Sequence, residues 1–235
     1  MYFRHSDRIW NDYPQLVAGV LAVELISPDA DAQDRIAKFE AIAASRLAQS
    51  SEGEFAEIQA WRRAFARMGL KPTQYRCASE ALLRRFRKEG DLPRIHPLID
   101  LCNAISIAFA IPIAAFDTAT IADHLEVRHA TGTELYESFA GETESPAPGE
   151  VIFADAANRA HARRWTNRQS ARSAVRGDTT GVLIVAEALH DTGRADVENL
   201  VETLADELAA VSPTAPTSAV LSRDAPRFDF GPYIS

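Results

Sequence analysis

The stretch RIHPLIDLCNAISIAFAIPIAAFD, from Arg94 to Asp117, limits the fold of this 235-residue chain more than any other. His96 and Pro97 suit the cap and the first position of a helix, where the missing N–H of proline costs nothing. Apolar residues then follow on two faces of the predicted helix, so other elements need to cover most of its surface. Pro112 ends the helical pattern, and a short strand is expected at 112–116.

Four polar residues, Arg94, His96, Asp100 and Asn103, lie in the opening turns of this apolar helix. Polar side chains are costly to bury unless they have hydrogen-bond partners. His96 and Asn103 are seven residues apart with Asp100 between them, so the three share one side of the helix. Two interpretations stay open. Either His96 caps the helix and Asp100 pairs with Arg94 or a backbone group, or this polar side faces a pocket.

The remaining hydrophobic pattern predicts helices at 30–49, 54–67, 79–88 and 195–211, and strands at 124–128, 150–154 and 181–189. Ser79 is expected to cap its helix. Residues 16–26 have the apolar density of a buried strand, although a helix is not excluded, and 161–169 is expected to be a strand that runs into a turn. Because helices come early and strands late, the order favours an α+β fold over a doubly wound sheet.

We expect a single domain over residues 1–211. The segment 212–235 contains four prolines and little periodicity, and it is expected to form an irregular C-terminal arm.

Composition and length exclude several classes of protein. With 46% hydrophobic residues, the chain can bury a sizeable core. It has no run of about 18 uninterrupted apolar residues and no apolar signal core at its start, so no membrane partner is expected. The two cysteines, Cys77 and Cys102, favour a reducing compartment over a disulfide scaffold. The expected location is the cytoplasm.

The positive charges are gathered in two segments, although the net charge is −8. Residues 62–94 carry ten Lys or Arg against three acids, and residues 159–176 carry six arginines and no acid. Arginine, with its forked guanidinium, suits contacts with phosphate. If both segments lie on one face, they form a footprint for a phosphate backbone; otherwise they are solvated helix faces with scattered ion pairs.

Several kinds of site have no support in the sequence. Neither GxGxxG nor a Walker-type loop is present, and the six histidines show no HxxxH or HxH spacing, so no cofactor and no metal are expected. Cys102 lies on the apolar face of its helix, where a thiol is usually inert packing, and no base pairs with Cys77. No GxSxG elbow occurs.

A second polar cluster, RRWTNRQSARS (163–173), joins an aromatic side chain to arginines and amides. Trp165 suits base stacking, and it suits core packing beside exposed arginines equally well. Four polar residues then follow in succession, as a turn that recognises a ligand requires: Asn167, Arg168, Gln169 and Ser170.

Three segments together resemble a known family: WRRAFARMGLKPTQYRCASEALLRRF, LPRIHPLIDLCNAISIAFAIPIAAFD and PGEVIFADAANRAHARRWTNRQS. They are similar to the B3/B4 domain, the editing module of the bacterial phenylalanyl-tRNA synthetase beta subunit, which also occurs as a free-standing protein. The resemblance spans roughly residues 55–189, and the chain looks like the free-standing form. It implies a three-layer α+β fold with an unusual β-sandwich flanked by helices. It also implies hydrolysis of the ester of a mischarged aminoacyl-tRNA in trans.

The resemblance fails at some motif positions. Where the synthetase motif has a histidine, two residues after the proline of its short strand, this chain has Ala114. Where the later motif has a glycine pair and a glutamate, this chain has Gln169, Ser170 and Arg172. The pocket is therefore expected to be rebuilt, and its amino acid to differ from tyrosine.

These considerations assign candidate roles to the polar residues. An aminoacyl ester is already activated, so a positioned water and a stabilised oxyanion can suffice for hydrolysis. The candidates that hold ester and water are His96, Asn103, Gln169 and Ser170. The candidates for contacts with the substrate are Glu80, Arg94, Asp100, Asn167 and Arg168, and Asp155 is a further carboxylate that suits a cationic side chain. The candidates for contacts with tRNA are Arg84, Arg85, Arg87, Arg163 and Arg164.

Two other functions stay open. One is a non-catalytic tRNA- or RNA-binding module of the same fold. The other is a small-molecule hydrolase or an amino-acid-binding regulator.

Overall fold

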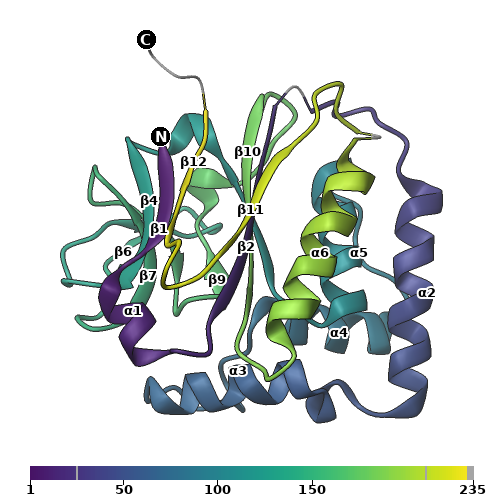
Figure 1. Cartoon of the computed structure of the whole chain (residues 1–235), viewed down its shortest axis with the longest axis horizontal. Helices are drawn as coiled ribbons and strands as arrows, with labels where there is room; N and C mark the ends of the chain where they lie inside the picture. The colour runs from purple at the N-terminus through teal and green to yellow at the C-terminus, as the bar shows by residue number, and fades with distance from the viewer. Residues whose placement is uncertain (25, 210, 232–235) are drawn as a thin grey trace.

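Two β-sheets and a layer of helices stack on one another in the computed structural model, which describes residues 1–24, 26–209 and 211–231 (Figure 1). The middle layer is a four-stranded sheet in the order β11 (Thr217–Leu221), β2 (Val17–Glu24), β10 (Gly181–Ala188) and β3 (Ile113–Asp117). All of its strand pairs are antiparallel. Residues 16–26 thus supply a strand, and the alternative of a helix is excluded for the part that the structure describes.

The second sheet has six strands and forms one outer layer. Its order is β12 (Arg227–Asp229), β1 (Tyr2–His5), β4 (His124–His129), β7 (Val151–Asp155), β8 (Ala160–Arg163) and β9 (Arg168–Gln169). β1 and β4 are parallel, and the other pairs are antiparallel. A small hairpin of β5 (Tyr136–Glu137) and β6 (Thr143–Glu144) lies beside β8.

The helices form the other outer layer and close one end of the molecule. α2 (Gln33–Gln49), α5 (Pro97–Phe109) and α6 (Gly193–Leu208) cover the free face of the four-stranded sheet (Figure 1). α3 (Ala56–Arg67) and α4 (Ala78–Glu89) follow a 3-10 turn at Glu52–Glu54, and α1 (Asp7–Asp12) joins β1 to β2. Two further 3-10 turns lie at Thr118–Thr120 and Ala171–Ser173.

Strand β10 divides the interior into two cores. Its alternating side chains point to opposite faces, because successive residues of a strand do so. Leu183 and Val185 pack into the core between the two sheets, whereas Val182 and Ile184 pack against the helical layer. Both faces are covered, which is why the predicted strand 181–189 is almost uniformly apolar.

The start of α4 corrects one expectation. Ser79 is not the N-cap; Cys77 precedes the helix, and the Ser79 hydroxyl is buried and donates a hydrogen bond to the carbonyl of Ala110 at 3.0 Å. The N–H of Ala78 instead donates to the carbonyl of Thr166 at 2.8 Å. A contact with a distant turn therefore replaces the local cap that the sequence suggested.

The C-terminal segment corrects a second expectation. The predicted irregular conformation after Ser212 is wrong, because β11 and β12 lie in this segment. β11 pairs with the outer edge of β2, and β12 pairs with the outer edge of β1. Pairing with an open sheet edge gives these residues backbone partners that a local pattern cannot indicate. The domain boundary at residue 211 stays a prediction, and residues 232–235 lie outside the described residues.

None of the helices in the described part of the chain has the length and the apolar character that crossing a bilayer requires.

The contact of α6 with β2 leads to a test of the packing. A Cβ at Gly19 would lie 2.4 Å from Cγ2 of Val201 and 3.0 Å from Cγ1 of Val197. Gly19→Ala should therefore push α6 off the sheet and lower the free energy of unfolding by about 1–3 kcal/mol. Denaturant unfolding measures this, with Gly177→Ala as the matched control, since a Cβ there has no neighbour within 4 Å. Equal stability of both variants would contradict this packing.

Candidate functional site

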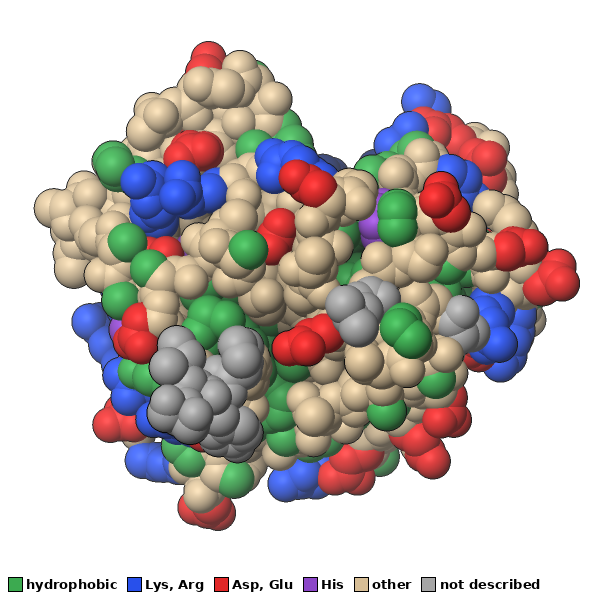
Figure 2. Space-filling view, turned by 90° about the horizontal axis from the view of Figure 1, so that it is seen from above, with side chains coloured by type: hydrophobic (Ala, Val, Ile, Leu, Met, Phe, Trp, Pro, Cys, Tyr) green, Lys and Arg blue, Asp and Glu red, His purple; other side chains and the backbone are tan. Residues whose placement is uncertain are grey.

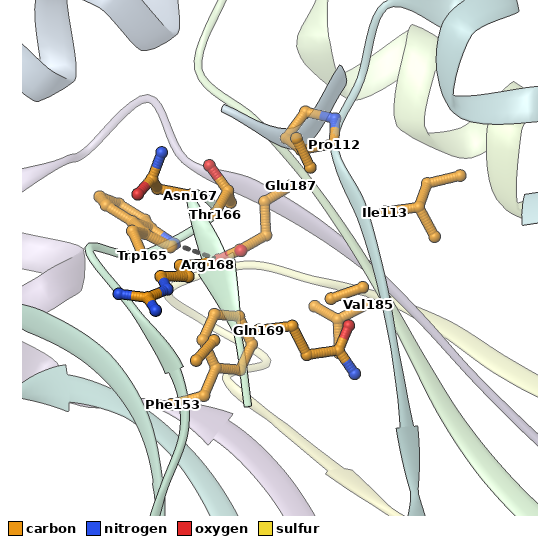
Figure 3. Close-up of a pocket in the computed structure, with 13 residues that line it drawn as sticks. Pro112, Ile113, Phe153, Trp165, Thr166, Asn167, Arg168, Gln169, Val185 and Glu187 are labelled. Atoms are coloured by element: carbon orange, nitrogen blue, oxygen red, sulfur yellow. Dashed lines mark hydrogen bonds between the residues drawn. The ribbon is translucent and has the colours of Figure 1, made fainter. Parts of the chain in front are cut away.

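A cavity of about 60 Å³ lies between the two sheets, where β3 and β10 face the turn between β8 and β9 (Figure 3). Its volume has room for a few water molecules or one small chemical group. Most of its lining is apolar. The lining residues are Ala78, Pro112, Ile113, Ala114, Phe153, Ala162, Trp165, Thr166, Asn167, Arg168, Gln169, Val185 and Glu187.

Glu187 places a carboxylate in this apolar lining. It follows Val185 by two residues on β10, so both side chains point to the same face of the sheet. Glu187 is 1% exposed to solvent. Its Oε1 lies 2.7 Å from Nε2 of His5 and accepts a hydrogen bond of 2.8 Å from the indole N–H of Trp165, which Figure 3 marks with a dashed line. Among the described residues, no donor lies within hydrogen-bond distance of Oε2.

The turn between β8 and β9 has a strained backbone. Arg164 and Trp165 have φ angles of 47° and 58°, in the left-handed region that residues other than glycine rarely adopt. The Trp165 ring is fully buried and meets the rings of Trp61 and Tyr13 at centroid distances of 5.0 and 4.8 Å. Trp165 therefore packs in the core and is not available for base stacking. Such strain persists only where the surroundings enforce it, and it often marks functional sites.

The amides predicted from the same cluster do line the cavity. Nε2 of Gln169 donates to the carbonyl of Ala115 at 2.7 Å, and Nδ2 of Asn167 donates to the carbonyl of Arg76 at 2.7 Å. Arg168 also lines the cavity, and its guanidinium lies 3.4 Å from Glu144. Ser170 differs from these three. Its buried hydroxyl donates to the carbonyl of Glu137 and accepts from the N–H of Arg172, outside the cavity lining.

The polar side of α5 forms a cap and does not line the cavity. His96 is the N-cap, and its Nδ1 accepts from the N–H of Leu98 at 3.2 Å. Burial lowers the pKa of His96, which favours this neutral accepting form. Asp100 accepts from the N–H groups of Ile95 and His96 at 2.8 and 3.4 Å. Its partners are thus backbone groups, as the first interpretation allowed.

Two other candidates on this segment also lie away from the cavity lining. Arg94 makes a forked contact with Glu40, at 2.9 and 3.2 Å. Asn103 is half-buried on α5 and is not among the lining residues.

The carboxylates proposed for a cationic side chain are engaged elsewhere. Glu80 is fully buried, and its Oε1 lies 2.6 Å from the guanidinium of Arg62. Asp155 accepts from the N–H groups of Ala122 and Arg159 and lies 3.2 Å from Nε2 of His161. Burial alone would raise the pKa of Asp155, but these contacts lower it to about 2. Both groups hold the fold, and neither lines the cavity.

The arginines predicted to contact tRNA are mostly paired with acids. Arg84 and Arg87 both contact the buried Glu52, and Arg85 contacts Glu89. On the molecular face drawn in Figure 2, blue and red side chains lie together in small groups and form no continuous basic field.

The two tRNA-binding candidates in the second arginine segment differ in burial, since Arg163 is buried and Arg164 is half-buried. The side chain of Arg163 is 7% exposed and is bound by Glu150 at 2.9 Å and by Glu144. It is therefore not available as a surface contact. Arg164 lies with its guanidinium 4.8 Å from the ring centre of Tyr75, and among the described residues no carboxylate forms an ion pair with it.

Neither thiol is placed for chemistry. Cys77 and Cys102 are free and buried, and burial raises the pKa of both to about 12. The described residues hold no group of three or more His, Cys, Asp or Glu side chains that could bind a metal ion.

Comparison with known proteins agrees with this architecture. A model of the B3/4 domain matches residues 60–200, which is more than half of the chain. The chain belongs to the B3/4 domain family. A search of curated proteins returned no match.

The solved structure of an N-terminal fragment of the phenylalanyl-tRNA synthetase beta-subunit from Pyrococcus horikoshii is similar, with a TM-score of 0.50 and 11% sequence identity. The alignment covers 94% of this chain and 52% of that fragment, so this chain spans about half of the fragment's length. At this identity the likeness shows the fold alone. It confirms the α+β class and the layered B3/B4 architecture.

The structure of this B3/4 domain also identifies two site residues that the sequence did not suggest. Glu187 is the single acid in the apolar strand GVLIVAEAL, and this isolated charge was a usable signal. His5 had no such signal, because it is 182 residues from Glu187 in the chain. Ala114 stands where the synthetase motif has a histidine. It lines the cavity and is paired with Val185 on the neighbouring strand β10.

Proposed function

We propose that this B3/4 domain hydrolyses the ester of a mischarged aminoacyl-tRNA in trans. The observation that supports this proposal most is the buried Glu187 carboxylate. One of its oxygens has no hydrogen-bond partner among the described residues, and the carboxylate lines a small, mostly apolar cavity. The fold relationship to a fragment of a phenylalanyl-tRNA synthetase subunit supports tRNA as the partner. A carboxylate in such surroundings is costly unless a ligand or a water satisfies it.

The proposed reaction uses this oxygen to hold the attacking water. The water donates a hydrogen bond to Oε2 of Glu187, and its oxygen bonds to the ester carbonyl carbon while its proton moves to the carboxylate. The carbon–oxygen bond to the ribose then breaks, and the ribose oxygen takes up that proton. His5 and Trp165 keep the carboxylate oriented through Oε1.

The oxyanion has a candidate donor in the same turn. The Asn167 side chain has two amide N–H groups, and one of them is bound to the carbonyl of Arg76. The second is free to stabilise the charge that develops on the carbonyl oxygen. Asn167 and Glu187 thereby replace Asn103 and His96 in the mechanism expected from the sequence.

We infer further that the amino acid is polar or cationic. Ala114 leaves no imidazole in the cavity, and Gln169 presents an amide. An amide has both donors and an acceptor for polar groups of the ligand.

The first test is the activity itself. Incubated with a panel of mischarged tRNAs, the purified protein should release one non-cognate amino acid and spare correctly charged tRNA. The panel includes canavanine on the arginine tRNA and tyrosine on the phenylalanine tRNA, and release of labelled amino acid is measured. A chelator should leave the rate unchanged, since hydrolysis here needs no metal. Binding of these tRNAs without any hydrolysis would favour the non-catalytic binding module.

A substitution at the cavity tests the mechanism. Glu187→Gln keeps an acceptor for His5 and Trp165 but removes the charge and the proton acceptor. We expect kcat to fall by about 100-fold or more, with little change in tRNA affinity. Glu134→Gln is the control, because Glu134 is an equally buried carboxylate outside the cavity, bound by Arg128. Full activity of the Glu187→Gln variant would remove Glu187 from the reaction.

The buried Arg163 and the half-buried Arg164 should behave differently. Arg164→Ala should weaken tRNA binding and reduce the slope of log K against log salt concentration by about one, with little loss of stability. Arg163→Ala should lower the free energy of unfolding by about 1–3 kcal/mol, because Glu144 and Glu150 lose the hydrogen bonds of a buried guanidinium. Filter binding at several salt concentrations and thermal unfolding measure the two effects. The assignment fails if Arg163→Ala is stable and Arg164→Ala binds tRNA normally.

A further inference from the structure

A groove of about 340 Å³ lies next to the cavity and gathers exposed apolar side chains. It is lined by Ile95, Ile99, Phe139, Gln169, Ala174, Val175 and Arg176. Phe139 is 72% exposed and Ile95 is 67% exposed, the two highest values among the large hydrophobic residues of the described chain. Exposed apolar residues that gather at one groove mark a site of interaction more often than scattered ones do.

The backbone holds both side chains in place. Ile95 precedes the cap of α5, and its N–H donates to Asp100 at 2.8 Å. Phe139 lies at the tip of the β5–β6 hairpin, beside Ser138. The N–H of Ser138 donates to the carbonyl of Glu142 at 2.8 Å, and the hydroxyl oxygen of Ser138 accepts from the N–H of Glu142 at 3.1 Å. The polar residues at the start of α5 thus present Ile95 at the surface.

Gln169 lies between the groove and the cavity. It lines both, and its Nε2 donates to the carbonyls of Ala115 and Ser173. The groove is therefore the neighbouring site for the next ring of a ligand whose ester lies in the cavity.

The charge of the groove suits a phosphate group. Arg176 is the only charged residue among those that line it. Its guanidinium donates to the carbonyls of Ala171 and Ala174, and no described carboxylate forms an ion pair with it. A nucleotide has a flat base that stacks on an aromatic ring and a phosphate that pairs with a guanidinium, so its chemistry matches this groove.

We propose that this groove binds the 3′-terminal nucleoside of the tRNA, with its base stacked on Phe139 and packed against Ile95, and its phosphate near Arg176. The inference rests on the proposed function, since it takes the aminoacyl ester to lie in the neighbouring cavity. It assigns Phe139 and Ile95 to recognition of the acceptor end and leaves the amino acid to Glu187 and its neighbours.

The test uses uncharged RNA, so that it needs no hydrolysis. A short RNA hairpin ending in single-stranded CCA is compared with the same hairpin whose last nucleotide is abasic, by fluorescence anisotropy. The wild-type protein should bind the complete end more tightly. Phe139→Ala should weaken that binding about tenfold and abolish the difference between the two RNAs. Phe139→Leu should do the same if stacking of the ring, and not apolar contact alone, holds the base.

The control is Leu135→Ala, since Leu135 is 45% exposed at the start of the same hairpin and does not line the groove. It should bind both RNAs like the wild type. If Phe139→Ala still discriminates between the RNAs, the inference is overturned while the deacylase proposal stands. If discrimination depends on Phe139 but no mischarged tRNA is hydrolysed, only the deacylase proposal fails. A wild-type dimer that becomes monomeric in Phe139→Ala, with unchanged RNA binding, would show that a second copy covers the groove.

Discussion

The contact on which the site depends is the buried link from Glu187 to Trp165 and His5. It joins the two sheets, because Glu187 belongs to the four-stranded sheet while His5 and the turn with Trp165 belong to the six-stranded one. In the low dielectric of the core such hydrogen bonds are strong. A buried polar group that lost its partner there would cost free energy of folding. The link therefore fixes the separation of the sheets at the cavity and the orientation of the carboxylate at once.

The strained turn follows from the same link. Trp165 reaches Glu187 from a left-handed backbone conformation, and the ring is held there by edge contacts with Trp61 and Tyr13. Packing of the large aromatic offsets the strain of the backbone. The following residues, Asn167 to Gln169, line the same cavity as Glu187. The polar groups of the cavity are thus held in place by the fold, as the proposed reaction with a positioned water requires.

Much of the fold could be predicted because its signals are local. The caps and periodicity of α5, and the apolar runs of β2 and β10, lie within single segments. The strands after Ser212 were missed because their partners are the edges of β2 and β1, far away in the chain. The polar lining of the cavity could be predicted in part for the same reason. Asn167 and Gln169 lie in a visibly polar cluster, whereas the surroundings of Glu187 depend on residues brought together by the sheets.

The arginines show how a correct local pattern acquires a different meaning in three dimensions. Glutamates of the segment between β4 and β7 bind the arginines of the following strands: Glu137 contacts Arg159 and Arg172, and Glu144 contacts Arg163 and Arg168. These pairs fasten the β5–β6 hairpin against β8 and β9, and that hairpin carries Phe139 at its tip. Ion pairs with partly exposed side chains contribute little singly, but a network of them fixes a geometry. The positive charge that suggested a phosphate footprint thus acts first within the protein, where it holds the hairpin that carries the ring of Phe139 at the groove.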